Sequence, residues 1–550
     1  MKKYKWSEKF ICVILLFQLI IEIKSDSAFS DSDSYTFETF SLPENGNFMP
    51  VLGNGHVGFQ ILSDSVYMNN LYNGAQGLSH RARIPNFGNI QIINYGELNG
   101  TVKYTMDTKS GIFRTSFSPK SKKYRLDHLI YAHRFYDRAI VNQFFISDLN
   151  CSIGKQAKVD CNNLVKFSIK AHNNNNDSKN FNEITIKIGQ YPGNATDDIE
   201  FMIKSGDLGD VEEGEQPRET DKVIKKAEDF EALKKELSIK TMCGSTKTVE
   251  DPIYQEDPSN CCVLWNHVPE EITLCGTAVK KTTMSSFTFV MTVDEHFSVA
   301  QQEMMDVLAQ TDLNLLNTHM EEWKHFWNDF DIHMDDSSDE GMNLARTIHA
   351  SIFYIVSSLP SLATNQPRGA FGGLSPTGLG RGGSNLDDYE GHVFWDSEIW
   401  MHIPVLLINP TWSEEMLHYR FLRAFPAALD YAQKTGYKGI RFPWESAFTG
   451  REVTQPCCPL VAANQHHITA DISYALRLHL ATTRDIHWFK REGCKLAIPI
   501  AQFWASRVSH NSTTNKYDIN NIMGPDEDHE NVDNNFYTNI AARQSLQFGQ

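Results

Sequence analysis

The chain has 550 residues and a formal net charge of −17, and 41% of its residues are hydrophobic. That hydrophobic fraction suffices for large cores and excludes a chain that is disordered throughout. The length predicts two to four domains, and the acidic balance without a dense stripe of Lys and Arg argues against a nucleic-acid partner.

The first 28 residues have the pattern of a secretory signal peptide. Four lysines between Lys2 and Lys9 precede an apolar run at 10–21, which is shorter than the roughly 18 residues of a membrane span. The polar stretch 24–28 is an imperfect cleavage site, so an uncleaved signal anchor is the alternative. We expect no stable membrane span and a location in the secretory pathway, extracellular or lysosomal.

Sequons and cysteines agree with an oxidising, exported environment. Cys12 would leave with the signal, and the remaining cysteines are odd in number, so at least one thiol is free or intermolecular. Local disulfides are expected within the pair Cys151/Cys161 and within the group Cys243, Cys261, Cys262 and Cys275. The Asn-x-Ser/Thr sequons are at Asn99, Asn150, Asn176, Asn194 and Asn511.

Between residues 35 and 293 the sequence alternates in short runs broken by Gly, Asn, Asp and Pro. Many short strands with frequent turns predict a large antiparallel β-sandwich, which we place at 30–297.

From residue 298 the hydrophobic period becomes helical, and no strands alternate with the predicted helices. This pattern predicts a helical linker at 298–340 and an all-helical domain at 341–550. The expected helices cover 299–316, 321–330, 341–359, 396–407, 413–435, 467–483, 486–507 and 541–548.

Three short motifs are weak signals for a nucleotide or metal. Gly378-x-Gly380-x-x-Gly383 lacks the preceding strand and following helix of a dinucleotide site. His466 and His467 are neighbours and point to different sides of a helix. The acids from Asp526 onward lack the glycine of a calcium loop. We expect no metal and no cofactor.

Four clusters in the helical region carry the groups that a saccharide site needs. Trp faces stack on the C–H groups of sugars, and carboxylates accept hydrogen bonds from sugar hydroxyls. The alternative is that Trp395 and Trp444 are core anchors and that the acids are charges at helix N-termini. The clusters are 392–400, 441–452, 465–467 and 523–539.

Glu527 is the strongest candidate for a proton donor. Gly524-Pro525 predicts a turn, so Glu527 lies on a loop rather than inside a helix. Like charges on both sides disfavour its ionised form, which suits a general acid. A solvated acidic loop is the alternative.

These stretches resemble glycoside hydrolase family 65, and within it the acid-trehalase-like branch. The similarity spans nearly the whole chain after the signal. Its most specific parts are Phe-Trp-Asp at 394–396 and Gly-Pro-Asp-Glu at 524–527, and its segments are 52–58, 323–330, 392–400, 442–452 and 523–539.

The resemblance implies an N-terminal β-sandwich, a helical linker and an (α/α)6 barrel that removes α-linked glucose with inversion. The expected carbohydrate substrate is glucosylgalactosyl-hydroxylysine of collagen-like proteins. The family's proton donor falls on Glu527, and its substrate-contacting pair falls on Trp395 and Asp396. Trp444 and Glu445 match a stretch that lines the same cleft.

Two departures from the family pattern affect this hypothesis. Asp528 stands where the family usually has Tyr, which puts the substrate fit in question. The family's general base, a Lys-Gln pair and a small C-terminal β-domain fall beyond Gln550. Twelve helices need roughly 200–260 residues, and 341–550 supplies 550 − 341 + 1 = 210. We therefore expect a truncated barrel in an incomplete chain.

Three alternatives stay open. Two are enzymes of the same family: an acid trehalase, and a phosphorylase in which phosphate replaces the activated water. The third is an inactive saccharide-binding fragment.

Overall fold

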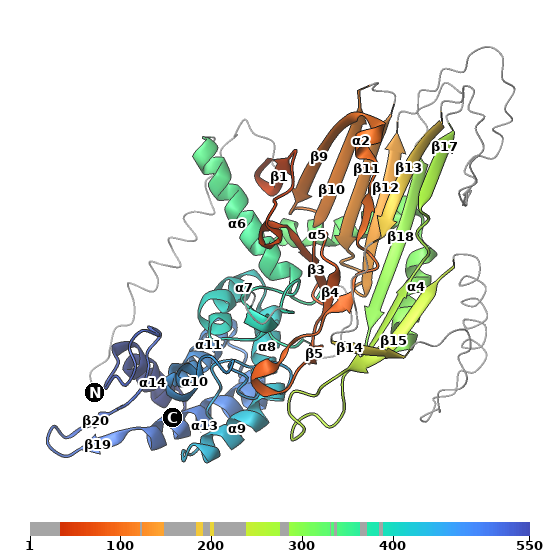
Figure 1. Cartoon of the computed structure of the whole chain (residues 1–550). Helices are drawn as coiled ribbons and strands as arrows, with labels where there is room; N and C mark the ends of the chain where they lie inside the picture. The colour runs from red at the N-terminus through yellow and green to blue at the C-terminus, as the bar shows by residue number, and fades with distance from the viewer. Residues whose placement is uncertain are drawn as a thin grey trace, which may run out of the picture.

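The computed structural model describes residues 33–120, 124–147, 183–190, 198–202, 238–275, 285–330, 332–334, 338–362, 371–383 and 389–550. The expected signal peptide, the pair Cys151/Cys161 and the sequons at Asn150, Asn176 and Asn194 lie outside these residues. A β-sheet region is followed by a helical region, and the two lie side by side (Figure 1).

An antiparallel sheet dominates the β-region. Its central strands are buried along most of their length on both faces, more than the alternation expected of a half-exposed sheet. Among the described residues it holds nine strands in the spatial order β1 (Thr36–Thr39), β9 (Gly100–Asp107), β10 (Ile112–Pro119), β11 (Arg125–Ala132), β12 (Ala139–Ser147), β18 (Ser285–Asp294), β16 (Asn260–Trp265), β15 (Lys240–Thr246) and β14 (Ile199–Met202).

Smaller sheets accompany the large one. One has the order β2 (Val51–Gly53), β3 (Val57–Gln60), β4 (Ser65–Met68) and β7 (Ile84–Pro85). Another has the order β17 (Glu271–Cys275), β13 (Glu183–Gln190) and β8 (Ile90–Ile92). Two short ladders pair β5 (Tyr72–Asn73) with β6 (His80–Arg81) and β19 (Ser509–Asn511) with β20 (Lys516–Asp518).

Cys243 and Cys262 face each other across β15 and β16 and form a disulfide with an S–S distance of 2.05 Å. This bond confirms that the predicted cysteine group contains a local disulfide. Cys261 beside it is a buried free thiol. The adjacent Cys457 and Cys458 are also bonded to each other.

Two helices connect the sheets to the helical region. α4 (Phe297–Leu308) packs on β16 and β18, and α5 (Asp312–Asp329) follows after a Thr311 N-cap. Trp323 and Trp327 lie one turn apart on α5 and are both buried, Trp323 with its ring centroid 5.0 Å from that of Phe353. The predicted single helix over 299–316 is wrong, because the chain turns between Leu308 and Asp312.

The helical region is built around α11 (His467–Thr483), whose N-terminal ten residues are nearly all buried. Its neighbours in space come from most of the region. The other elements are α6 (Asp339–Ser357), η5 (Ser397–Met401), α7 (His402–Ile408), α8 (Pro410–Tyr419), η6 (Arg420–Ala424), α9 (Phe425–Lys434), α10 (Pro459–Asn464), α12 (Ile486–Trp488), η7 (Phe489–Gly493), α13 (Cys494–Arg507) and α14 (Phe536–Phe548).

Three of the predicted long helices contain a π-helical turn, namely η5, η6 and η7. Each turn is followed within six residues by a proline: Pro404, Pro426 and Pro499. A proline inside a helix removes one backbone donor and clashes with the carbonyl four residues earlier. At η5 and η6 the carbonyl four residues before the proline belongs to the π-turn, so the proline accounts for the wider turn. At η7 five α-helical residues separate the turn from Pro499. Hydrophobic periodicity predicts none of these turns.

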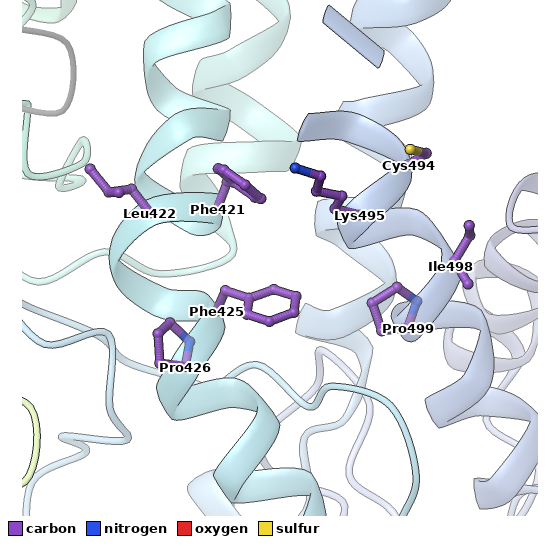
Figure 2. Close-up of a pocket in the computed structure, with 8 residues that line it drawn as sticks. All are labelled: Phe421, Leu422, Phe425, Pro426, Cys494, Lys495, Ile498 and Pro499. Atoms are coloured by element: carbon purple, nitrogen blue, oxygen red, sulfur yellow. The ribbon is translucent and has the colours of Figure 1, made fainter. Parts of the chain in front are cut away.

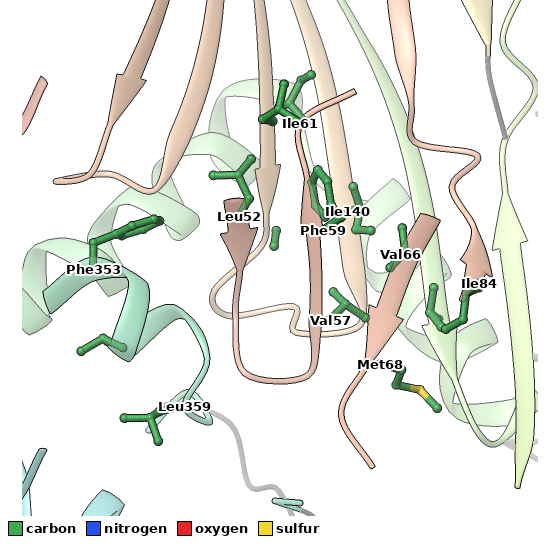
Figure 3. Packing of buried hydrophobic residues seen from close by; sticks show 14 of the residues in the cluster. Leu52, Val57, Phe59, Ile61, Val66, Met68, Ile84, Ile140, Phe353 and Leu359 are labelled. Atoms are coloured by element: carbon green, nitrogen blue, oxygen red, sulfur yellow. The ribbon is translucent and has the colours of Figure 1, made fainter. Parts of the chain in front are cut away.

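One hydrophobic core is shared by the β-region and the first helices. Leu52, Val57 and Phe59 of the β2–β3 hairpin pack toward Ile140, and Phe353 of α6 lies on the other side (Figure 3). The hairpin approaches closely at Gly55, which has φ +88° and where a Cβ would lie 2.1 Å from the Leu359 carbonyl oxygen. Only glycine fits this contact. In the described part of the chain, no helix is long and apolar enough to cross a membrane.

Candidate active site

The stretches around Trp395 and Trp444 are held together by backbone pairing. Val393 N donates to Ser446 O at 2.8 Å, and Ser446 N donates to Val393 O at 3.1 Å. These residues are 53 positions apart in the sequence. The predicted Trp-Asp and Trp-Glu pairs therefore lie on adjoining segments.

A buried arginine fixes both stretches to π-turn η6. Arg420 Nε and Nη2 donate to the two carboxylate oxygens of Glu398 at 2.8 and 3.0 Å. Nη1 also donates to Ser446 Oγ at 3.1 Å, and Nη2 to Phe394 O at 3.2 Å. The planar guanidinium suits this bidentate geometry. Arg420 thereby holds the backbone immediately before Trp395.

The loop that carries Glu527 is docked on the start of α11. Met523 N donates to Asn464 O at 3.0 Å, and Gln465 and Met523 form a parallel bridge. Gly524 packs closely against the Asn535 side chain, and a Cβ would lie 2.4 Å from Asn535 Nδ2. Asn535 in turn caps α14 by accepting from Thr538 N. Local packing thus places the predicted turn and the acid after it.

Glu527 is exposed, and its Oε1 accepts a hydrogen bond from Gln465 Nε2 at 3.3 Å. Asp526 shapes the loop by accepting from Asp528 N at 3.1 Å, and its other oxygen contacts His529 Nδ1 at 2.6 Å. Asp528 is exposed. The predicted loop position of Glu527 is confirmed. Its nearest polar partner is an amide of the neighbouring cluster rather than another acid.

Trp395 and Asp396 lie beside the start of α11. The Trp395 ring meets the His467 ring edge-on, with centroids 5.0 Å apart, and the Tyr537 ring at 6.1 Å. Burial raises the pKa of Asp396; the negative charge of Asp471 also raises it, and His467 opposes that change. The segment just before η5 therefore meets α11 and α14 at one place.

Glu445 is a buried carboxyl next to a buried histidine. His392 Nδ1 lies 2.8 Å from Glu445 Oε2. Burial raises the pKa of Glu445 to about 8, with further contributions from the charges of Glu452 and Glu527. Trp444 packs edge-on against the Phe394 ring at 5.3 Å. Glu445 and Glu527 are thus close enough to interact, although they come from separate clusters.

The group in the described chain that could hold a metal is Glu390, His392 and Glu445, whose ligand atoms lie within 4.8 Å of one another. Within the group, His392 pairs with Glu445. Gln455, which lies outside the group, donates from Nε2 to Glu390. Burial lowers the pKa of His392 to about 4, so it pairs with Glu445 as a neutral ring. His392 Nδ1 and Glu445 Oε2 are therefore paired with each other without an ion.

The weak motifs take structural roles. Arg81 Nη1 donates to Gly378 O at 2.7 Å, and Gly380 packs against Val51 of the β2–β3 hairpin. His466 Nδ1 accepts from Arg507 Nε at 2.9 Å, on a different side of α11 from His467.

Asp471 was missed by sequence reasoning, whereas its partners His467 and Tyr537 lie in the predicted clusters 465–467 and 523–539. His467 Nδ1 contacts Asp471 Oδ2 at 2.7 Å, and Tyr537 Oη donates to Asp471 Oδ1 at 2.7 Å. The i, i+4 spacing of His467 and Asp471 on one helix is a signal that could have found the first contact. The approach of Tyr537 from α14 has no local signal.

A separate apolar groove of about 570 Å³ lies between the helix of η6 and α9 and helix α13 (Figure 2). No residue of the four clusters lines it. Its lining residues are Phe421, Leu422, Phe425, Pro426, Cys494, Lys495, Ile498 and Pro499.

Comparisons with known proteins agree with the motif resemblance. Residues 375–550 match the model of the glycosyl hydrolase family 65 central catalytic domain. The protein-glucosylgalactosylhydroxylysine glucosidase of Gallus gallus is 29% identical over 521 residues, covering 94% of this chain and 63% of that protein. The kojibiose hydrolase of Flavobacterium johnsoniae is 36% identical over 256 residues, covering 46% of this chain and 35% of that protein. The resemblance to family 65 is confirmed.

A solved structure supports the fold. A putative kojibiose phosphorylase from the human microbiome aligns with a TM-score of 0.60 at 15% identity, over 94% of this chain and 65% of that one. The chain spans 61–65% of the length of the Gallus gallus, Mus musculus and Dictyostelium discoideum glucosidases that it matches.

Proposed function

We propose that this chain, which matches the family 65 catalytic domain over residues 375–550, is an inverting glycosidase that removes α-linked glucose. The preferred substrate is glucosylgalactosyl-hydroxylysine of collagen-like proteins, in keeping with the glucosidases that resemble the chain over 94% of its length. In this role Trp395 stacks on the terminal glucose and Asp396 accepts hydrogen bonds from its hydroxyls. Trp444 and Glu445 line the same cleft.

The observation that carries the proposal is a chain of contacts between Glu527 and the Trp395-Asp396 pair. Glu527 contacts Gln465, Gln465 contacts His467, and the His467 ring packs against Trp395. A donor on an exposed loop can reach a glycosidic oxygen. The stacking ring and the carboxylate beside α11 hold the sugar. Glu527 protonates the departing oxygen while a second carboxylate, about 6.5–9.5 Å away on the other face, activates water. The resemblance assigns that second carboxylate to no residue of this chain.

The same resemblance supports the finer architecture. We infer a β-sandwich at 30–297, a helical linker at 298–340 and an (α/α)6 catalytic barrel from residue 341. The end of β18 at Asp294 and the start of α6 at Asp339 support these divisions.

The test is glucose release from glucosylgalactosyl-hydroxylysine by the purified chain, followed by proton NMR. Inverting hydrolysis of an α-linkage gives β-glucose first. Trehalose, and kojibiose with and without phosphate, are tested in parallel. Faster release from trehalose would favour an acid trehalase, and phosphate-dependent formation of glucose phosphate would favour a phosphorylase. Binding of the glycoside without release of glucose would favour the inactive saccharide-binding alternative.

We also propose that the protein enters the secretory pathway. Asn99 supports this, because it is exposed in a left-handed turn that leads into β9. Expression in a secretory host should remove about the first 25–30 residues and add glycans that shift the mass. An intact, unglycosylated chain recovered from the cytosol would contradict the proposal.

A further inference from the structure

A chain of hydrogen bonds runs from Glu527 into the core of the helical region. Gln465 Nε2 donates to Glu527 Oε1 at 3.3 Å, and Gln465 Oε1 lies 2.9 Å from His467 Nε2. His467 Nδ1 lies 2.7 Å from Asp471 Oδ2, and Tyr537 Oη donates to Asp471 Oδ1 at 2.7 Å. We call Gln465, His467 and Asp471 the relay.

The relay is buried, whereas the acid at its end is exposed. Gln465, His467 and Asp471 are 1%, 0% and 1% exposed. Buried polar groups of this kind must be hydrogen-bonded, since an unpaired one is strongly destabilising. Each amide group of Gln465 is used, because its Nε2 also lies 3.5 Å from Met523 Sδ. The Gln465 amide is therefore held between His467 on one side and Glu527 on the other.

The geometry points to a role for the relay in the reaction: we propose that Gln465 is a positioning residue for Glu527 and that His467 and Asp471 set which end of its amide faces the acid. The inference rests on the proposed role of Glu527 as proton donor.

The donors and acceptors of His467 and Asp471 decide which end of the Gln465 amide faces Glu527. The Asp471 carboxylate only accepts, so His467 Nδ1 carries a proton. If His467 Nε2 is also protonated, it donates to Gln465 Oε1, and the amide N–H faces and stabilises an ionised Glu527. If Nε2 is unprotonated, it accepts from the amide, and the Gln465 carbonyl faces Glu527. That orientation accepts a hydrogen bond from the protonated carboxyl, which is the form that a general acid needs.

His467 also contacts Trp395, which is proposed to stack on the glucose. Its ring lies edge-on to Trp395 with centroids 5.0 Å apart, and its charge acts on Asp396. The same buried histidine therefore touches the residues proposed to hold glucose and orients the residue that holds the acid. Tyr537 anchors Asp471 from α14.

The kinetic test uses Gln465→Met, which keeps an unbranched side chain but removes the amide. We expect kcat on a substrate with a sugar leaving group to fall about tenfold to a hundredfold, the loss of one hydrogen bond to a charged group. Hydrolysis of α-glucosyl fluoride, whose leaving group needs no proton, and KM should stay close to wild type. His467→Gln should also lower kcat on the sugar-leaving-group substrate and, because His467 packs against Trp395, raise KM. His466→Gln, one residue away and outside the relay, should change neither. Equal losses on both substrates would overturn the proposal.

The second test needs no activity. In protein with ¹⁵N-labelled histidine, Glu527→Gln should shift the ring nitrogen signal of His467 Nε2, although the two side chains do not touch. Asp528→Asn removes the same charge from the same loop and should leave the signal unchanged. An unmoved signal in Glu527→Gln, or equal shifts in both variants, would overturn the relay. If the wild type releases no glucose, the proposed function fails while this experiment still decides the connection.

Discussion

The buried ion pair of Arg420 and Glu398 should be a principal support of the site. In Arg420→Met the carboxylate of Glu398, 2% exposed, loses its partner inside the protein. Breaking a buried pair in this way destabilises a protein by about 3–5 kcal/mol. The double variant Arg420→Met/Glu398→Leu removes both charges, so only the hydrogen bonds to Ser446 and Phe394 remain lost. At about 1 kcal/mol each, the double variant should lose about 2 kcal/mol and be more stable than the single one.

The assay is guanidinium unfolding of the helical region followed by circular dichroism. Lys324→Met is the control, since Lys324 pairs with Glu321 and both side chains are more than half exposed, and surface pairs contribute about 0–1 kcal/mol. If Arg420→Met lost no more than this control, or if the double variant were as unstable as the single one, the energetic role assigned to the pair would be wrong.

The remaining predictions concern the cleft. Glu527→Gln should slow hydrolysis of a sugar–sugar linkage by about 10²–10⁴-fold and spare α-glucosyl fluoride; equal rates on both substrates would remove it from the acid role. Trp395→Ala should weaken glucoside binding by about 1–3 kcal/mol through lost stacking, by analogy with other stacked rings. Asp396→Asn should weaken binding by removing charge-assisted hydrogen bonds. Calorimetric affinities equal to wild type would contradict the proposed roles of Trp395 and Asp396 in binding glucose. The pKa of Glu445 is raised to about 8 in the folded state from an ordinary 4.5, so the stability that this group contributes is complete below about pH 4.5 and is lost as the pH rises through 8. Glu445→Gln should flatten that fall relative to wild type in melting curves across this range, and an unchanged slope would refute the assignment.

Sequence periodicity predicted the long helices because their buried faces recur every three to four residues. Helix α11 begins and ends where predicted, at His467 and Thr483. Periodicity did not predict the π-turns, because these are local changes in the backbone hydrogen-bond ladder. It also missed the break between α4 and α5, where the apolar pattern continues across a turn.

The candidate residues were found by type and spacing, whereas their contacts depend on tertiary pairing. Nothing local indicates that Val393 pairs with Ser446 or that Gln465 reaches Glu527. The partner of Glu445 could not be predicted for the same reason, since His392 is 53 positions away. The sequence thus predicted the candidate acids Glu445 and Glu527 but not which buried side chains contact them.

The core shared by the β2–β3 hairpin and α6 affects how the helical region can be engineered. Because the hairpin turn at Gly55 abuts the carbonyl of Leu359, the helical region lacks a complete surface of its own at this end. Transplanting residues 341–550 alone onto another sheet would expose Phe353 and its neighbours. A chimera that folds must therefore carry the β2–β3 hairpin together with the helices. The segment to transplant is defined by packing rather than by the domain boundary in the sequence.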